Sequence, residues 1–280
     1  MDSIIHNKIN TISQNKTWLF VPATRIDRVV KAFASGADAV IVDLEDAVAP
    51  EDKASAREAL QQYHDSAGYQ PVWVRINKAG SKEFFKDIVL CQKTPNLTGL
   101  LLAKTEQAED INNVHQLTNL PVIALIESAI GLYQLDSMAK AVGLAAFSYG
   151  FLDLCNDLQV QVGTPAADIV ANQIRYQLVL ISKVHELAPP IDTVYPDFND
   201  EIGLSARVNL WSQIGMSGML CIHPKQVAVV QQALKPTDKA LSFARRVVEE
   251  YESSEQAVFE IDGEMVDAPV IERSRQLLAK

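Results

Sequence analysis

Short apolar runs recur along the chain, separated by about 20 to 30 residues in most places. Few polar residues interrupt them, and they do not alternate, which is the pattern of strands that are buried on both faces of a sheet. We therefore predict eight buried, parallel strands. They are 18–21, 39–42, 72–76, 99–103, 121–126, 144–148, 191–194 and 218–222.

Helical patterns lie between these runs. Segment 25–35 has apolar residues at helical spacing and is followed by Gly36, which is typical of a helix C-terminus. Segments 51–63 and 166–187 are predicted to be helices as well. Eight strands, each followed by a helix, predict an α/β fold of the (β/α)8 or TIM-barrel type. An open doubly wound sheet is the alternative, but no GxGxxG sequence follows the first strand.

The eight strand–helix units are complete near residue 234, so we predict a barrel domain over 1–234. The segment 235–280 contains a predicted helix at about 240–251 and a final helix from about residue 270. Such a segment is too short to build a large core of its own. We expect it to be a helical extension that packs on the barrel or on a neighbouring subunit.

Charge and composition narrow the class of protein. The 280 residues include 35 acidic and 25 basic side chains, and this net charge of −10 argues against binding to nucleic acids or anionic membranes. No apolar run approaches the length of about 20 residues that spans a membrane, and the polar start does not resemble a signal peptide. The three cysteines are far apart and form no CxxC pair. We expect a soluble, cytoplasmic protein with reduced thiols.

Two acidic residues follow neighbouring predicted strands. Glu127 comes directly after the fifth strand, and Asp153 comes shortly after the sixth. In a barrel the carboxyl ends of all strands meet on one face, where active sites lie. Two carboxylates, with water or substrate as the other ligands, are a usual way to bind Mg²⁺. The alternative is that each acid caps the helix that follows it.

Charged residues also close the second, third and fourth strands. Arg75 could bind a carboxylate or a developing oxyanion through paired hydrogen bonds, or form a salt bridge with Asp43 or Glu45 that ties the rim of the barrel. The acids 43–46 are more typical of helix capping and rim pairing than of a metal site. Lys104 could form a Schiff base, although an ion pair with Glu106 is an equally good interpretation.

At this point the sequence resembles the citrate lyase β-subunit-like enzymes of the HpcH/HpaI aldolase superfamily. The similar segments run through almost the whole chain, in order and at spacings that suit a barrel. They are 18–22 (WLFVP), 38–48 (DAVIVDLEDAV), 74–77 (VRIN), 124–129 (ALIESA), 150–154 (GFLDL), 221–226 (CIHPKQ) and 263–269 (GEMVDAP). One departure is Leu152, where relatives often carry an acid.

The resemblance implies a TIM barrel that binds Mg²⁺ and acts on a thioester of coenzyme A (CoA) or an acyl carrier. The reaction would make or break a C–C bond between an acetyl thioester and a 2-oxo acid. Citramalyl-CoA, malyl-CoA or citryl-CoA would be the substrate. Relatives form trimers or larger rings, so the resemblance also implies a homo-oligomer, either a trimer or a hexamer.

The resemblance also assigns roles to residues. Glu127 and Asp153 would be the metal ligands, and Arg75 would act on the oxo acid or its oxyanion. Asp267 would be a catalytic acid or base that a neighbouring subunit delivers. The remaining candidates are Asp43, Glu45 and Gly150 at the substrate, and Lys16 and Arg25, with Arg28, at the phosphates of CoA.

Three other functions remain open at this point. The chain could be the citryl-acyl-carrier lyase subunit of a citrate lyase complex, although nothing in one chain indicates the partner subunits. It could be a metal-dependent aldolase that acts on free hydroxy-oxo acids, which would not bind CoA. It could also be a non-catalytic subunit that kept the barrel and lost the chemistry.

Overall fold

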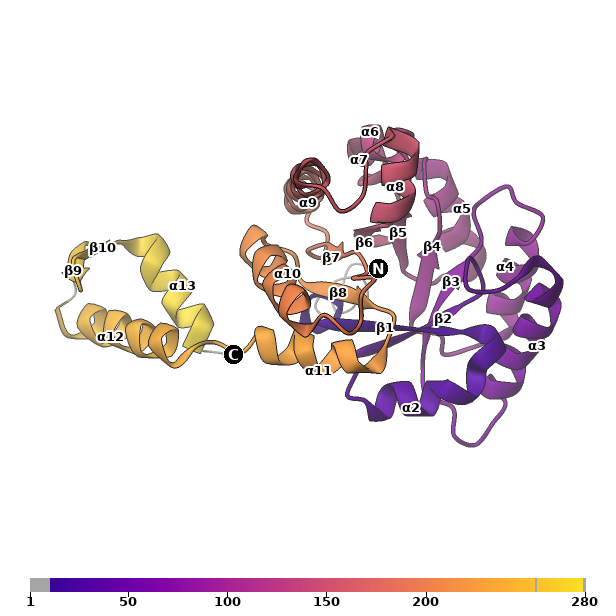
Figure 1. Ribbon diagram of the computed structural model, residues 1–280, viewed down its shortest axis with the longest axis horizontal. Helices are drawn as coiled ribbons and strands as arrows, with labels where there is room; N and C mark the ends of the chain where they lie inside the picture. Colours follow the sequence, from indigo (N-terminus) through magenta and orange to yellow (C-terminus); the bar gives the residue numbers. More distant parts are fainter. Residues whose placement is uncertain (1–10, 255, 279–280) are drawn as a thin grey trace. The chain divides into compact units, whose positions relative to one another are not determined.

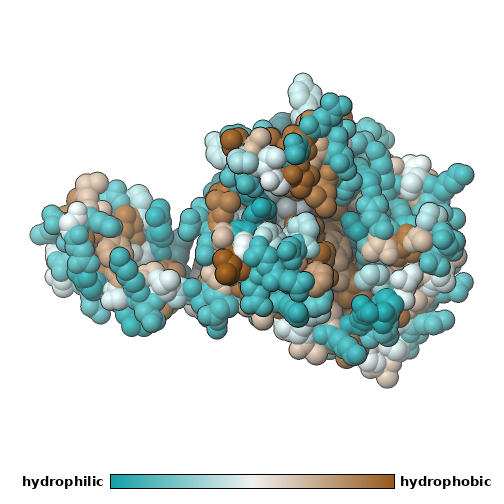
Figure 2. Space-filling view, in the orientation of Figure 1, coloured by the Kyte–Doolittle hydropathy of each residue, from teal (hydrophilic) through white to brown (hydrophobic). Residues whose placement is uncertain are grey.

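The structure is a computed structural model that describes residues 11–254 and 256–278 (Figure 1). The chain consists of two compact units, the first ending at Ala233 and the second beginning at Leu234. The first unit carries the larger core and the candidate site. Figure 2 shows mostly hydrophilic residues on the visible face of each unit, with smaller apolar patches among them.

Eight parallel strands form a closed barrel in the order β1 to β8, which confirms the predicted fold. Each strand hydrogen-bonds to its sequence neighbours, and β8 closes the barrel by pairing with β1. The strands are β1 (Thr17–Pro22), β2 (Ala39–Asp43), β3 (Trp73–Ile76), β4 (Gly99–Leu102), β5 (Val122–Ile126), β6 (Leu144–Tyr149), β7 (Ile191–Asp192) and β8 (Gly218–Cys221).

Helices connect the strands and surround the barrel. The segment predicted as one helix over 25–35 is divided into a 3-10 helix that begins at Ala23 and a short α-helix, and the backbone of Arg25, within the 3-10 helix, is not helical. The helices of this unit are η1 (Ala23–Arg28), α2 (Val29–Ala34), η2 (Pro50–Asp52), α3 (Lys53–His64), α4 (Phe84–Lys93), α5 (Ala108–Thr118), α6 (Ala129–Tyr133), α7 (Leu135–Met138), α8 (Phe151–Leu158), α9 (Pro165–Val184), α10 (Glu201–Ile214) and α11 (Pro224–Ala233). Among the described residues, no helix combines the length and the apolar character needed to cross a membrane.

Large side chains fill the barrel interior. The rings of Trp18 and Trp73 pack edge to face with their centroids 5.3 Å apart. Gly99 leaves room for Trp73, because a Cβ at this position would lie 2.3 Å from the indole ring. The three cysteines are buried and unpaired, and burial raises the pKa of each thiol. They therefore act as core residues, as the sequence predicts.

β7 is much shorter than predicted, since it contains only two residues and pairs with β6 at a single position. Side chains supply the missing connections between these strands. The hydroxyl of Tyr149 donates to Asp192 at 2.7 Å, and Arg175 of α9 donates to both carboxylate oxygens of Asp192 at 2.8 and 3.2 Å. This buried group of three residues holds the end of β6 in place.

The register of the strands brings their C-terminal ends to one rim. Asp43 pairs with both Pro22 and Arg75, and Ile126 pairs with Tyr149. The loops that follow these residues therefore share one face of the barrel, where parallel barrels carry their active sites.

The second unit contains two helices and an antiparallel hairpin: α12 (Asp238–Ser254), β9 (Phe259–Ile261), β10 (Glu264–Val266) and α13 (Ala268–Leu278). The sequence analysis did not predict the hairpin. Its turn is Asp262–Gly263, both with positive φ, which is the sequence that favours a two-residue hairpin turn. Apolar residues of both helices and the hairpin form a small buried cluster of this unit.

Candidate active site

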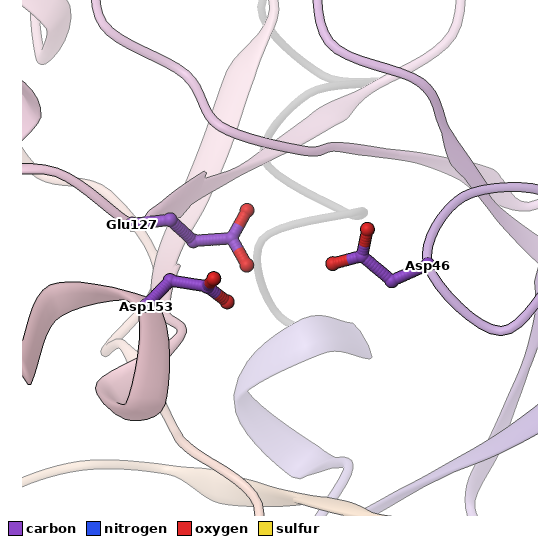
Figure 3. A group of neighbouring side chains, drawn as sticks. All are labelled: Asp46, Glu127 and Asp153. Atoms are coloured by element: carbon purple, nitrogen blue, oxygen red, sulfur yellow. The ribbon is translucent and has the colours of Figure 1, made fainter. Parts of the chain in front are cut away.

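Three carboxylates gather at the C-terminal face of the barrel. One oxygen each of Asp46, Glu127 and Asp153 lies within 4.8 Å of the other two. Figure 3 shows Glu127 and Asp153 side by side, with Asp46 pointing toward them from the loop after β2. Glu127 directly follows β5, and Asp153 lies in the first turn of α8. Three carboxylates so close together repel one another unless a cation or protons neutralise them.

Glu127 is buried at the centre of this group. Burial, followed by the negative charge of Glu45, raises the pKa of Glu127 to about 7, although the backbone N–H of Lys104 donates to its carboxylate at 2.8 Å. The alternative that Glu127 caps the next helix is wrong, because Ser128 accepts the cap hydrogen bond from the N–H of Gly131. The Glu127 carboxylate is thus directed into the site.

Gly150, predicted to line the substrate site, lies directly against Glu127. A Cβ at Gly150 would lie 2.6 Å from Oε1 of Glu127 and 2.8 Å from its Cγ. The backbone of Gly150 is extended, with φ −99°, a conformation that any residue can adopt. Glycine is required here because the Glu127 side chain leaves no room for a Cβ. The absence of a side chain here allows the Glu127 carboxylate to approach the start of α8.

Arg75 forms both of the salt bridges that the sequence analysis considered, one with Asp43 and one with Glu45. Its Nε donates to Asp43 at 2.7 Å, its Nη2 donates to the other oxygen of Asp43, and its Nη1 lies 3.3 Å from Glu45. Burial alone would lower the pKa of Arg75, but the hydrogen bonds and charge of Asp43 and the nearby glutamates raise it well above its usual value. Arg75 therefore keeps its positive charge at any pH where the protein folds.

Lys104 contacts both sides of the acidic group. Its N–H binds Glu127, while its ammonium donates to Glu45 and, at 3.0 Å, to Asp46. Its backbone is left-handed, with φ 51°, which costs energy for a residue other than glycine and is a feature found at functional sites. The predicted Lys104–Glu106 pair is wrong, because Glu106 binds Lys78 instead at 2.9 Å. The buried Glu45 attracts an ammonium more strongly than the more exposed Glu106 does.

The acids next to Lys104 respond to burial differently. Burial, as the largest cause, raises the pKa of Glu45 despite its contacts with Arg75 and Lys104. Asp46 is more exposed, and although burial acts to raise its pKa, hydrogen bonds with Glu45 and Lys104 outweigh this and lower it. Asp46 is therefore ionised at neutral pH, on the side of the group opposite Glu127.

Two cavities open beside these residues. One of about 380 Å³ is lined by Lys104, Glu127, Asp153 and their neighbours. A second of about 480 Å³ is lined by Phe20, by His223 after β8, and by three cations of the β1–α2 region, Arg25, Arg28 and Lys31. Phe20 also contacts Arg75, whose guanidinium lies over its ring at 4.9 Å from the centroid. Arg25 forms a surface ion pair with Asp27 at 3.1 Å.

Lys16 does not join the group, which corrects the prediction that it contacts the same ligand as Arg25. It precedes β1, whereas the site follows the C-terminal ends of the strands, so Lys16 lies at the opposite end of the barrel. Its ammonium donates to the carbonyl of Ser13 at 2.8 Å. A strand of the length of β1 separates the two ends by about 20 Å.

Asp267 belongs to the second unit, between β10 and α13. Its side chain accepts a long hydrogen bond, 3.4 Å, from the N–H of Val270 in the first turn of α13, and it is partly exposed. Its predicted catalytic role stays a prediction.

The sequence analysis underestimated two residues, Asp46 and Lys104. The run 43–46 was interpreted as a capping and rim-pairing segment, and its three acids do form ion pairs, Asp46 with Lys104, but Asp46 also faces Glu127 and Asp153. The signal was present in the sequence, since Asp46 closes an acidic run after a strand of the same barrel face as Glu127 and Asp153.

Comparisons with known proteins agree with this geometry. A family model described as HpcH/HpaI aldolase/citrate lyase matches residues 16–224. A citrate lyase subunit beta-like protein of Mycobacterium tuberculosis is 33% identical over 267 residues, or 94% of each chain. A (3S)-malyl-CoA thioesterase of Cereibacter sphaeroides is 30% identical over 269 residues, covering 94% of this chain and 93% of the relative.

Solved structures are similar as well. The crystal structure of CitE from Mycobacterium tuberculosis in complex with magnesium, acetoacetate and coenzyme A has a TM-score of 0.86 and 32% identity, covering 95% of this chain and 97% of that one. The citrate lyase beta subunit of the same organism, complexed with oxaloacetate and magnesium, has a TM-score of 0.72 and 32% identity, covering 81% of this chain and 100% of that one.

Proposed function

The chain belongs to the HpcH/HpaI aldolase/citrate lyase family, and from that premise we propose that it is a Mg²⁺-dependent carbon–carbon lyase. It would make or break the bond between an acetyl thioester of CoA and a 2-oxo acid, as in a citramalyl-, malyl- or citryl-CoA lyase. The observation that carries this proposal is the group of three carboxylates beside the permanently charged Arg75, at the C-terminal face of the barrel.

The donor set suits a magnesium ion. All three groups are carboxylates, and Mg²⁺ prefers oxygen ligands and usually takes only one or two from protein side chains. Glu127 and Asp153 would bind the ion, with Asp46 facing it and oxygens of water and substrate as the other ligands. When bound, the ion would supply Lewis-acid stabilisation of oxygen charge and would orient the substrate.

Arg75 would stabilise negative charge on the oxo acid. Asp43 binds two of its nitrogens and Glu45 a third, so its position is fixed before the substrate arrives. A donor that is already oriented needs no rearrangement when charge develops on an oxygen, which is the main advantage of such a group in catalysis. Asp43 and Glu45 thereby serve the substrate site by orienting Arg75.

The phosphates of CoA would bind at the second cavity. Arg25, Arg28 and Lys31 line it, so it gathers positive charge on a protein whose net charge is −10. Phe20, which lines this cavity, also contacts Arg75. A thioester could therefore extend from this cavity to the carboxylate group.

A homo-oligomer, a trimer or a hexamer, is part of the proposal. It is supported by apolar side chains exposed along α9, since contiguous apolar surface is typical of protein contacts. Ile169, Tyr176, Leu180 and Val184 are between 45% and 64% exposed.

Asp267→Ala tests the proposed acid or base of the second unit. We expect turnover to fall by about 10²–10⁴, which is the usual contribution of a positioned acid or base. Mg²⁺ affinity should stay close to that of the unmodified protein, because Asp267 is not among the clustered carboxylates. Steady-state kinetics and calorimetry with Mg²⁺ measure the two quantities. Full activity of the variant would remove Asp267 from the mechanism.

Gly150→Ala tests whether the position of Glu127 matters for the metal. The new methyl group would displace the Glu127 carboxylate, so we expect Mg²⁺ affinity to fall by about 10–100-fold, as for other losses of support around a metal ligand. Gly68→Ala is the matched control, since its Cβ would meet no atom within 4 Å. Equal Mg²⁺ affinity of the two variants would contradict the prediction.

The central experiment is direct turnover. Purified protein is incubated with Mg²⁺ and, separately, citramalyl-CoA, malyl-CoA and citryl-CoA, and the products are separated by chromatography. We expect acetyl-CoA and a 2-oxo acid from at least one thioester. Release of free CoA with an intact hydroxy acid would instead assign the activity for which the Cereibacter relative is named. No turnover of any thioester by the metal-bound protein would contradict the proposed reaction class.

A further inference from the structure

A lysine lies beneath the acidic loop that follows β2. We infer that Lys53, the first residue of α3, is a positioning residue for the proposed metal centre. Its buried ammonium holds residues 43–47, here called the acid turn, so that the Asp46 carboxylate faces Glu127 and Asp153. This inference rests on the proposed function, because it concerns the same metal centre.

All three N–H groups of the Lys53 ammonium donate hydrogen bonds, two to the acid turn and one to Asn77. It donates to the carbonyls of Leu44 and Glu45, both at 2.7 Å, and to Oδ1 of Asn77 at 2.9 Å. These are three short hydrogen bonds, one for each N–H of the group. Two of them bind consecutive backbone carbonyls and therefore fix the peptide planes immediately before Asp46.

The N–H groups of the acid turn are fixed independently. Leu44 donates to the carbonyl of Arg75 at 3.0 Å. The N–H groups of Glu45 and Ala47 both donate to Asp43, at 2.8 and 3.1 Å, and that of Asp46 donates to the side chain of Glu45 at 2.8 Å. Lys53 thus adds to the carbonyl contacts of a turn whose donors are already bound, since the carbonyl of Glu45 also accepts from the N–H of Val48 at 3.0 Å, which leaves the Asp46 backbone little freedom.

Further polar residues lie around Asn77. Asn77 donates to the carbonyl of Leu44 at 3.0 Å and to Asp87 at 2.6 Å, and Arg57 binds Asp87 at 2.9 Å. Arg57 also binds Glu83 at 2.7 Å. Arg57 thus belongs to the same buried network, but its hydrogen bonds go to Asp87 and Glu83 and not to the acid turn. It therefore provides a matched control.

The charge of Lys53 adds to its hydrogen bonds. Its three acceptors are neutral oxygens, so no carboxylate in hydrogen-bond contact cancels the positive charge. Burying such a charge costs free energy, and the three hydrogen bonds to the acid turn and to Asn77 offset that cost.

The test compares Lys53→Met with Arg57→Met, each of which removes one cation from the same network. Mn²⁺ replaces Mg²⁺ as the probe, because its free form is measured directly by electron paramagnetic resonance. We expect Lys53→Met to raise the Mn²⁺ dissociation constant by about 10–100-fold. Arg57→Met should lower the melting temperature while changing the Mn²⁺ dissociation constant less than about twofold. If Lys53→Met does not fold, Lys53→Gln, which keeps polar donors, is measured instead and should weaken binding by at least about fivefold.

A double-mutant cycle separates positioning from general loosening. If Lys53 acts through Asp46, adding Lys53→Met to Asp46→Asn should cost little further affinity, so the two losses are not additive. Additive losses, an unchanged Lys53→Met, or an equal loss in Arg57→Met would each overturn the inference. An unmodified protein that binds no Mn²⁺ would instead refute the proposed function, so the two failures are distinguishable.

Discussion

Glu127→Gln is expected to weaken Mg²⁺ binding strongly and to lower thioester turnover by about a thousandfold or more, since a catalytic metal contributes several kcal/mol. Glutamine keeps the shape of the side chain but removes the charge, and the buried position leaves no solvent to compensate. It can still accept the hydrogen bond from the N–H of Lys104, so the fold should survive. Calorimetry with Mg²⁺ and steady-state kinetics measure the two effects.

The pH dependence of metal binding provides the control for Glu127. Because its pKa is raised to about 7, the metal-free group holds a proton below that pH and must release it to bind an ion. Mg²⁺ affinity of the unmodified protein should therefore rise about tenfold per pH unit below about pH 7 and level off above it. Residual binding to Glu127→Gln should not show this rise. The same pH dependence in the variant would assign the proton to another group.

Arg75→Met is expected to lower kcat/KM by about 10²–10³, which is the usual cost of removing one preoriented donor to a developing oxyanion. It should also destabilise the fold, because the buried Asp43 would lose its ion pair, although Glu45 keeps that with Lys104. Breaking a buried ion pair from one side typically costs about 3–5 kcal/mol. Kinetics below the melting temperature and urea denaturation separate the two losses.

Arg75→Lys and Arg57→Met are the controls for this result. Lysine keeps the charge of Arg75 but cannot bind Asp43 through two parallel hydrogen bonds, so activity should recover only in part. Arg57→Met removes a cation from another buried network and should cost stability without a comparable loss of kcat/KM. Similar kinetic losses in both methionine variants would show that Arg75 acts through stability alone.

The barrel could be predicted from the sequence because its strands are buried on both faces. Each strand is therefore a continuous apolar run, which can be recognised without knowing which side chains pack together. The sequence also predicted that Glu127 and Asp153 meet, because adjacent barrel units bring successive strand ends together. The pairing of Arg75 with Asp43 follows from the same rule, since these residues stand side by side in the register of β2 and β3.

The predictions that failed concern loops and the ends of strands. The loop that ends in Asp46 is bound by Lys53, nine residues after Leu44, and by Asn77 at the end of the next strand, and no local pattern reveals these contacts. The partner of Lys104 depends on its left-handed backbone and on the burial of Glu45. Lys16 was selected for its charge and its nearness to Arg25 in the sequence, without regard to the direction of the strand that it precedes.

Strands β6 and β7 pair at a single position, so the seam between these two strands is the weakest connection around the barrel wall. Side-chain contacts reinforce it, among them those of Tyr149, Asp192 and Arg175 and the hydrogen bond from the Ser148 hydroxyl to the carbonyl of Ile191, and β6 leads directly into the helix that carries Asp153. Local opening should therefore begin at this seam, and backbone amides of β7 should exchange with deuterated solvent before those of β2 or β5. A partial opening of this kind would separate Asp153 from Glu127 while most of the barrel stays folded, so the protein would lose its function well before it loses its secondary structure.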